Sequence, residues 1–100
     1  MGFEIIWTPK ALNTFGKRIN YLEKHWTEKE LVRFTSRVND YLLILKEQPL
    51  MFRQSYKVKH THIGVIIKEV SLIYRVKPRN KIIELIAFID NRQNPKSTPA

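Results

Sequence analysis

The spacing of apolar residues changes near residue 50, and this change limits the folds that the chain can adopt. Before it, apolar side chains recur every three or four residues, at Leu12, Phe15, Ile19, Leu22 and Trp26 and again at Leu31, Phe34, Val38, Leu42 and Leu45. After it, they alternate with polar residues or form short branched runs. The first spacing is typical of amphipathic helices and the second of strands. The pattern therefore predicts two helices followed by a sheet.

Local start and stop signals place the two helices. The Thr8-Pro9 pair suits a helix N-cap and first helical position, and a capping box begins the second helix at Thr27. Pro49 ends that helix near Glu47. Only His25 and Trp26 separate the two patterns, so we expect a helical hairpin.

Gly16 lies inside the first helical pattern. A glycine there costs about 1 kcal/mol relative to alanine. We therefore expect close packing at this position, against a neighbour that the sequence does not identify.

The strands are read from branched and aromatic runs. One precedes the helices, at Phe3 to Trp7, and four follow them, at about Ser55 to Lys59, Ile63 to Ile67, Val70 to Lys77 and Lys81 to Ile89. Lys68-Glu69 predicts a two-residue turn, and Pro78 with Asn80 predicts a hairpin in which the asparagine is left-handed. The predicted fold class is α+β, with the helical hairpin packed on a mainly antiparallel twisted sheet. It forms one domain over residues 1–96, followed by a flexible tail at 97–100.

Net charge is the strongest compositional signal. The 100 residues carry a net charge of +9, of which residues 51–100 contribute +7. Such a field favours a polyanionic partner, either nucleic acid or an acidic polypeptide, and a basic surface that serves only solubility is the alternative. The chain has no cysteine, no apolar run long enough for a membrane span and no secretory pattern in residues 1–15. We expect a cytoplasmic protein without membrane partners.

Strand alternation divides the later residues between two faces of the sheet. The face predicted to lie under the helices holds Tyr56, Val58, Leu72, Tyr74, Val76, Ile83, Leu85, Ala87 and Ile89. The open face holds Lys57, Lys59, Ser71, Ile73, Arg75, Lys77, Glu84, Ile86, Phe88, Asp90 and Arg92. Cations around apolar side chains suit a binding surface, which we predict at Arg75, Lys77, Phe88 and Asp90. An ion pair between Arg75 and Glu84 across the sheet is the structural alternative.

The ordered set of elements resembles the RelE/ParE superfamily of type II toxin-antitoxin toxins. The resemblance spans about residues 3 to 96 and depends on Trp7 to Ala11, on Tyr74-Arg75-Val76 and on the closing segment Phe88 to Pro95. It implies a growth-inhibiting bacterial toxin of the kind linked to plasmid stabilisation. It also implies a cognate antitoxin encoded beside it, which wraps the toxin across its sheet and helices.

The resemblance implies two alternative targets. RelE-like members are metal-independent endoribonucleases that cleave mRNA on the ribosome, and Lys57, Lys59 and Arg92 match their basic catalytic positions. However, Ser71 occupies a position where many relatives carry arginine, and no tyrosine follows Arg92. These departures fit the ParE-like branch, which inhibits DNA gyrase. Enzymatic activity therefore stays open, and a non-catalytic basic module that binds nucleic acid or protein is the alternative.

Histidine provides the remaining candidate chemistry. His60 or His62 could act as a proton shuttle in a ribonuclease, because histidine titrates near neutral pH. The pair could also bind a metal, but a third ligand is not evident, and we predict neither a metal nor a cofactor. Tyr74 is expected to be buried. The exposed apolar residues are compatible with a homodimer or with a toxin-antitoxin hetero-oligomer.

Overall fold

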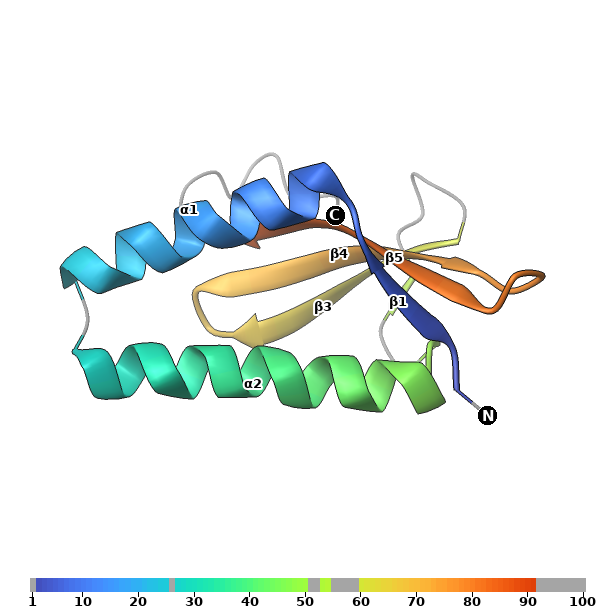
Figure 1. The fold of residues 1–100 in the computed structure, drawn as a ribbon, viewed down its shortest axis with the longest axis horizontal. Helices are drawn as coiled ribbons and strands as arrows, with labels where there is room; N and C mark the ends of the chain where they lie inside the picture. Colours follow the sequence, from blue (N-terminus) through green and yellow to red (C-terminus); the bar gives the residue numbers. More distant parts are fainter. Residues whose placement is uncertain (1, 26, 51–52, 55–59, 92–100) are drawn as a thin grey trace.

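The computed structural model describes residues 2–25, 27–50, 53–54 and 60–91 (Figure 1). Its elements are β1 (Glu4–Trp7), α1 (Pro9–His25), α2 (Glu28–Glu47), β2 (Arg53–Gln54), β3 (Thr61–Ile67), β4 (Val70–Lys77) and β5 (Ile82–Asp90). The predicted order of elements is confirmed. The strand predicted at residues 55–59 and the tail predicted at residues 97–100 lie outside the described residues.

The five strands form one sheet in the order β1-β5-β4-β3-β2. β1 runs parallel to β5, and the other neighbours are antiparallel. This confirms the α+β class with a mainly antiparallel sheet. Both helices lie on one side of the sheet, where α1 packs chiefly on β5 and α2 on β3 (Figure 1). Neither helix combines the length and the apolar character that a membrane crossing requires.

Both predicted helix starts are confirmed. The Thr27 side chain accepts a hydrogen bond from the Glu30 backbone N–H at 3.3 Å, and the Glu30 carboxylate accepts one from the Thr27 N–H at 3.2 Å. At the start of α1, Thr8 Oγ1 accepts from the Ala11 N–H at 3.1 Å and donates to the Leu85 carbonyl at 2.7 Å. The second bond joins the cap of α1 to β5, so it also fixes how α1 is rotated on the sheet.

The rotation of α1 corrects one part of the predicted core. Leu12 was expected to be buried, but its side chain is 58% exposed, and Ala11 is fully buried in its place. The cap bond to Leu85 turns the helix so that the smaller residue meets the sheet. The α2 stripe is confirmed, with Phe34, Val38 and Leu45 buried. Trp26 lies outside the described residues.

A β-bulge in β5 reverses the predicted faces of its second half. Ile73 pairs with Ala87 and Tyr74 with Leu85, so Ile86 is the extra residue. Leu72 then pairs with Phe88 on the helix side of the sheet. Beyond the bulge, the prediction that Phe88 and Asp90 lie on the open face is wrong, and so is the prediction that Ala87 and Ile89 lie under the helices.

Phe88 belongs to the core. Its side chain is 1% exposed, and its ring lies 5.6 Å from the ring of Trp7 and 5.1 Å from that of Phe15. The Phe15 ring in turn stacks on Phe34 of α2 at 5.9 Å. This aromatic cluster joins β1, both helices and β5.

Asp90 also faces α1. Its carboxylate lies 3.4 Å from the guanidinium of Arg18, and both side chains are largely buried. Two residues earlier on the same strand, the Phe88 N–H donates to Thr14 Oγ1 at 2.9 Å. The end of β5 is therefore attached to α1 by polar contacts and is not available as an open binding surface.

Gly16 differs from its prediction. A methyl group built at this position would meet no heavy atom within 4 Å. The expected close packing within the chain is therefore wrong, because Gly16 lies beside the buried stripe of α1 and does not face the sheet.

Candidate functional site

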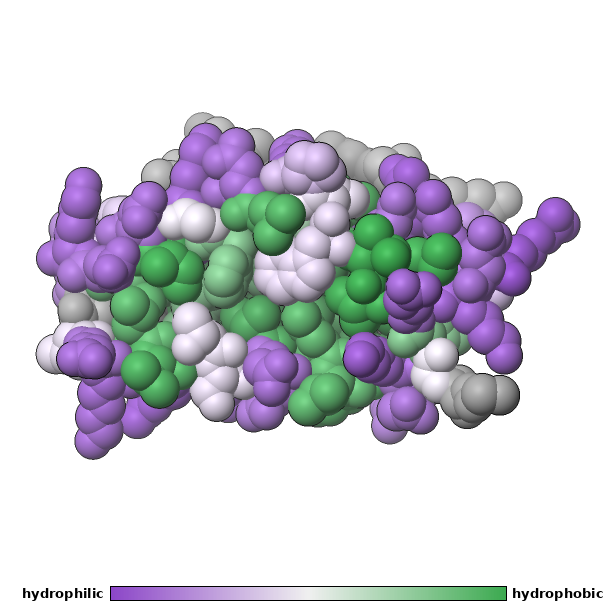
Figure 2. Space-filling view, viewed as in Figure 1, coloured by the Kyte–Doolittle hydropathy of each residue, from purple (hydrophilic) through white to green (hydrophobic). Residues whose placement is uncertain are grey.

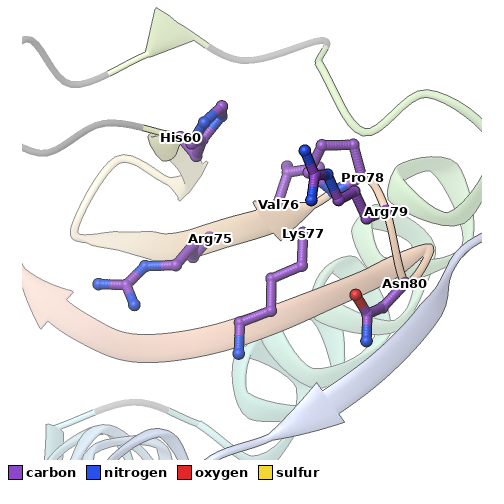
Figure 3. Close-up of a pocket in the computed structure, with 7 residues that line it drawn as sticks. All are labelled: His60, Arg75, Val76, Lys77, Pro78, Arg79 and Asn80. Carbon is purple, nitrogen blue, oxygen red and sulfur yellow. The ribbon is translucent and has the colours of Figure 1, made fainter.

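The candidate site is a basic concavity of about 440 Å³ beside the hairpin that joins β4 and β5 (Figure 3). It is lined by His60, Arg75, Val76, Lys77, Pro78, Arg79 and Asn80. Figure 3 shows Arg75 and Lys77 leaving β4 on the same side. The predicted binding residues Arg75 and Lys77 are thus brought together, and His60 joins them.

Strand geometry places the two cations of β4. Arg75 and Lys77 are two residues apart, so both point to the face of the sheet opposite the helices. β4 is hydrogen-bonded on both sides, with Arg75 opposite Thr61 of β3 and Glu84 of β5. The backbone that carries both cations is therefore held in place by a neighbouring strand on each side.

The hairpin adds a third cation that the sequence interpretation treated only as part of a turn. The Lys81 N–H donates to the Pro78 carbonyl at 3.3 Å, which leaves Arg79 and Asn80 exposed at the centre of the turn. Lys81 has φ 54°, so Lys81 and not Asn80 takes the left-handed conformation. This arrangement is common in hairpins with a slightly longer loop, where the left-handed residue follows the turn.

Backbone geometry separates the two histidines. His60 has φ 62°, and its carbonyl accepts a hydrogen bond from the Val76 N–H at 3.0 Å. The strand alternation therefore begins only after His60, which is exposed beside the concavity. His62 is 4% exposed and stacks on Tyr74 with ring centres 5.2 Å apart, so it does not line the concavity. Within the described part of the chain, no group of three His, Asp or Glu side chains could hold a metal.

The charges of the site are only partly compensated. Lys77 Nζ lies 3.4 Å from the Glu84 carboxylate, although Glu84 is opposite Arg75 in the sheet register. Both side chains of this ion pair are partly exposed, so the pair contributes only about 0–1 kcal/mol. Arg75 is exposed and forms no ion pair with any described residue. The site can therefore offer a free guanidinium to an anionic group.

Ser71 lies apart from the concavity and has a structural role. It is 3% exposed, and its hydroxyl donates to the Asn91 side-chain oxygen at 2.8 Å. Asn91 in turn donates to the backbone carbonyls of Lys68 and Glu69. These bonds hold the β3–β4 turn against the end of β5. The three predicted catalytic residues Lys57, Lys59 and Arg92 lie outside the described residues, so their placement relative to the concavity stays a prediction.

The fold, together with the comparisons with known proteins, defines a small α+β protein of the RelE/ParE superfamily. Within it, the sequence profile described as the ParE toxin of the type II toxin-antitoxin system parDE matches residues 5–95. The chain therefore belongs to the ParE toxin family. No curated protein sequence matches it.

Solved structures support the same fold. A chain of the chromosomal ParDE toxin-antitoxin system from Pseudomonas aeruginosa has a TM-score of 0.69 at 13% identity, covering 88% of this chain and 95% of that one. The toxin RelE of Escherichia coli, a double mutant in the free state, gives 0.64 at 12% identity and coverages of 95% and 90%. The RelBE2 complex of Mycobacterium tuberculosis gives 0.62 at 13% identity and coverages of 90% and 99%.

Proposed function

We propose that this chain is the toxin of a type II toxin-antitoxin module, that it inhibits bacterial growth by blocking DNA gyrase, and that a cognate antitoxin neutralises it. The family match over residues 5–95 carries the assignment to toxins. An antitoxin partner is supported by the likeness to toxin chains whose structures include toxin-antitoxin complexes. The proposed target is cytoplasmic, and we place the protein in that compartment.

The choice of gyrase over mRNA is supported by the position of Ser71. Where a ribonuclease relative would carry a cation for the developing phosphorane charge, this chain uses a buried hydroxyl to bind Asn91. The exposed cations Arg75, Lys77 and Arg79 are suited to binding an acidic surface, because they need only Coulombic attraction and hydrogen bonds for that role.

Ribosome-dependent mRNA cleavage is the second candidate function, and the placement of His60 favours it. An exposed imidazole beside Arg75 and Lys77 combines a group that can donate or accept a proton with cations that could stabilise a phosphorane. The unplaced Lys57, Lys59 and Arg92 would complete that site. A degenerate toxin that only binds nucleic acid or protein is the non-toxic alternative.

Expression in a bacterium separates a toxin from a binding module. Induction of the chain alone should arrest growth, and co-expression of the polypeptide encoded by the neighbouring reading frame should restore it. Normal growth with folded, soluble protein present would contradict the toxin assignment and favour the binding module.

Two reconstituted assays separate the targets. Purified protein should inhibit supercoiling by DNA gyrase, and it should leave mRNA intact in a programmed ribosome complex. If mRNA is cleaved instead, His60→Gln should reduce the cleavage rate by about 10²-fold, as expected for loss of a general acid or base. Cleavage of mRNA together with unaffected gyrase would overturn the proposed target.

A further inference from the structure

The concavity beside the β4–β5 hairpin carries more positive charge than the described part of the chain compensates. Arg75, Lys77 and Arg79 line it, and among the described residues Glu84 is the one carboxylate within ion-pair distance of any of them. That carboxylate pairs with Lys77, so Arg75 and Arg79 have no ion-pair partner in the same residues. An anionic ligand can therefore bind without displacing an ion pair from either arginine.

The spacing of the two cations on β4 indicates which anion fits. Arg75 and Lys77 are two residues apart on one strand, which places their Cα atoms about 7 Å apart. Figure 3 shows both side chains extending from the same side of the strand. Alternate residues of an extended peptide have the same separation and also point to one side. Two carboxylates separated by one residue in an extended segment can therefore face both cations at once.

The shape of the site favours a peptide over nucleic acid. Its volume of about 440 Å³ is comparable to that of pockets that hold a small ligand. A duplex instead presents a long row of phosphates, which proteins neutralise with many cations over a broad face. None of the described residues that line the concavity is Phe, Tyr or Trp, whereas single-stranded nucleic acid is commonly bound by stacking its bases on such rings.

Glu84 adds a negative charge that discriminates between anions. Its carboxylate lies 3.4 Å from Lys77 Nζ, and its backbone is opposite Arg75 in the sheet register. A long polyanion that crosses the site must pass this carboxylate, and like charges repel. A short segment with two carboxylates has only to compete with Glu84 for one cation. Glu84 therefore lowers the affinity of the site for every anion, and most of all for the most highly charged ones.

The two sides of the molecule differ in character. Figure 2 shows apolar side chains gathered between α1 and α2 on the helix side. Arg75 and Lys77 point to the opposite face of the sheet. An acidic partner is therefore attracted to that face, and a second copy of this chain, which carries the same cations there, is repelled from it.

We propose that the concavity binds an acidic segment of DNA gyrase that presents two Asp or Glu residues, separated by one residue, in an extended conformation. The inference rests on the proposed function and adds the chemistry of the contact. One carboxylate meets the free guanidinium of Arg75, which can bond it through two N–H groups, and the other meets Lys77 in competition with Glu84. Arg79, exposed in the hairpin, attracts the segment as it approaches.

Synthetic peptides test the spacing. Two labelled peptides of one composition are compared, one containing the order Asp-Thr-Asp and the other Asp-Asp-Thr, each flanked by threonine and valine. In fluorescence anisotropy the first peptide should bind about 10-fold more tightly, because it alone reaches both cations. Equal binding of the two peptides would overturn the inference.

Substitutions then locate the binding site of the first peptide. Arg75→Ala should weaken its binding by about 10-fold, and Arg75→Lys should weaken it less, because lysine keeps the charge without the paired N–H groups. Glu84→Gln should strengthen binding by about 3- to 5-fold, since it removes the competing carboxylate. The control is Arg37→Ala, which removes an exposed arginine from α2 on the helix side and should leave the dissociation constant within about 2-fold of wild type.

Inhibition of supercoiling connects the site with gyrase. Arg75→Ala should raise the concentration of the chain that halves supercoiling by about 10-fold, and Glu84→Gln should lower it. Inhibition that neither substitution changes would overturn the inference and leave the proposed function standing. A wild-type chain that binds the first peptide without inhibiting gyrase would overturn the proposed function, and with it the assignment of the segment to gyrase.

Two further results would assign the concavity to another occupant and so overturn the inference. One is a labelled duplex or single-stranded oligonucleotide that binds the chain more tightly than the first peptide does. The other is a loss of binding of the polypeptide encoded by the neighbouring reading frame in Arg75→Ala, with gyrase inhibition unchanged. The first result would assign the site to nucleic acid and the second to the antitoxin.

Discussion

Arg18 of α1 and Asp90 at the end of β5 form an ion pair of 3.4 Å that is largely withdrawn from solvent. The Arg18 Nε atom is buried and has no hydrogen-bond partner within the described chain. The pair thus holds the last described strand against the first helix. This ion pair is shielded from water, and the Nε donor of its arginine has no acceptor among the described residues.

Loss of either member of this pair should be costly. Asp90→Asn removes the only carboxylate within ion-pair distance of Arg18 in the described residues and leaves a buried cation. We expect the free energy of unfolding, measured by urea denaturation, to fall by about 3 kcal/mol. The exposed pair of Lys77 and Glu84 provides the control, and Glu84→Gln should cost about 1 kcal/mol or less. Equal losses from the two substitutions would contradict this account.

The burial of Phe88 can be tested in the same way. Phe88→Ala should lower the free energy of unfolding by about 3–5 kcal/mol, because the ring packs between Trp7 and Phe15. Val65 on β3 is 53% exposed, and Val65→Ala serves as the control, with a change of about 0.5 kcal/mol or less. A small effect of Phe88→Ala would mean that the open-face position predicted by strand alternation was correct.

The bulge at Ile86 shows what strand alternation alone could not predict. Alternation placed Arg75 and Lys77 correctly, because the extra residue of each register shift lies on a neighbouring strand and not on β4. In β5 one extra residue reversed every later side chain, and nothing in the apolar run from Ile82 to Ile89 marks its position. Local start signals were reliable because Thr8 and the capping box act within a few residues. The bulge in β5 and the rotation of α1 depend instead on contacts between residues that are far apart in the chain.

The same distinction holds for the site. The shared face of Arg75 and Lys77 could be predicted from the two-residue spacing of a strand. The separation of His60 from His62 depends on the left-handed backbone of His60, which the spacing does not show. Arg79 could have been recognised from the basic run between Lys77 and Lys81, had the turn been considered as a surface as well as a connection. Leu12 and Gly16 were misplaced because the rotation of α1 is set by a bond between Thr8 and Leu85, residues far apart in the chain.

That bond gives a third prediction. Thr8→Val keeps the shape of the side chain but removes both the cap of α1 and the hydrogen bond to β5. We expect a loss of about 1–2 kcal/mol in the free energy of unfolding, at the upper part of the range for N-caps. Thr35→Val in α2 is the control, because among the described residues the exposed Thr35 hydroxyl donates only to the carbonyl of Val32 within the same helix. A loss from Thr35→Val as large as that from Thr8→Val would show that the cross-element bond adds nothing.

Arg75 should contribute to toxicity without contributing to stability. Arg75→Ala removes an exposed guanidinium that has no ion-pair partner among the described residues, so the melting temperature should stay within about 2 °C of wild type. Growth arrest on induction should be weakened, as read from the colony count at matched expression. Arg37→Ala, which removes an exposed arginine from α2, should retain full toxicity. Full toxicity of Arg75→Ala would show that the concavity is not part of the target-binding surface.

The dependence of binding on salt distinguishes a nucleic-acid target from a protein target at the concavity. If Arg75, Lys77 and Arg79 each neutralise a phosphate of duplex DNA, the logarithm of the association constant should fall with the logarithm of salt concentration with a slope of about −2.7. Arg75→Ala should then reduce the slope by about 0.9, whereas Arg37→Ala should leave it unchanged. Fluorescence anisotropy with a labelled duplex measures both values. Because the proposed target is gyrase, we expect the isolated chain to bind the duplex weakly. The effect of Arg75→Ala should then be seen in binding to gyrase. Tight duplex binding with the full slope would favour the non-toxic nucleic-acid-binding module.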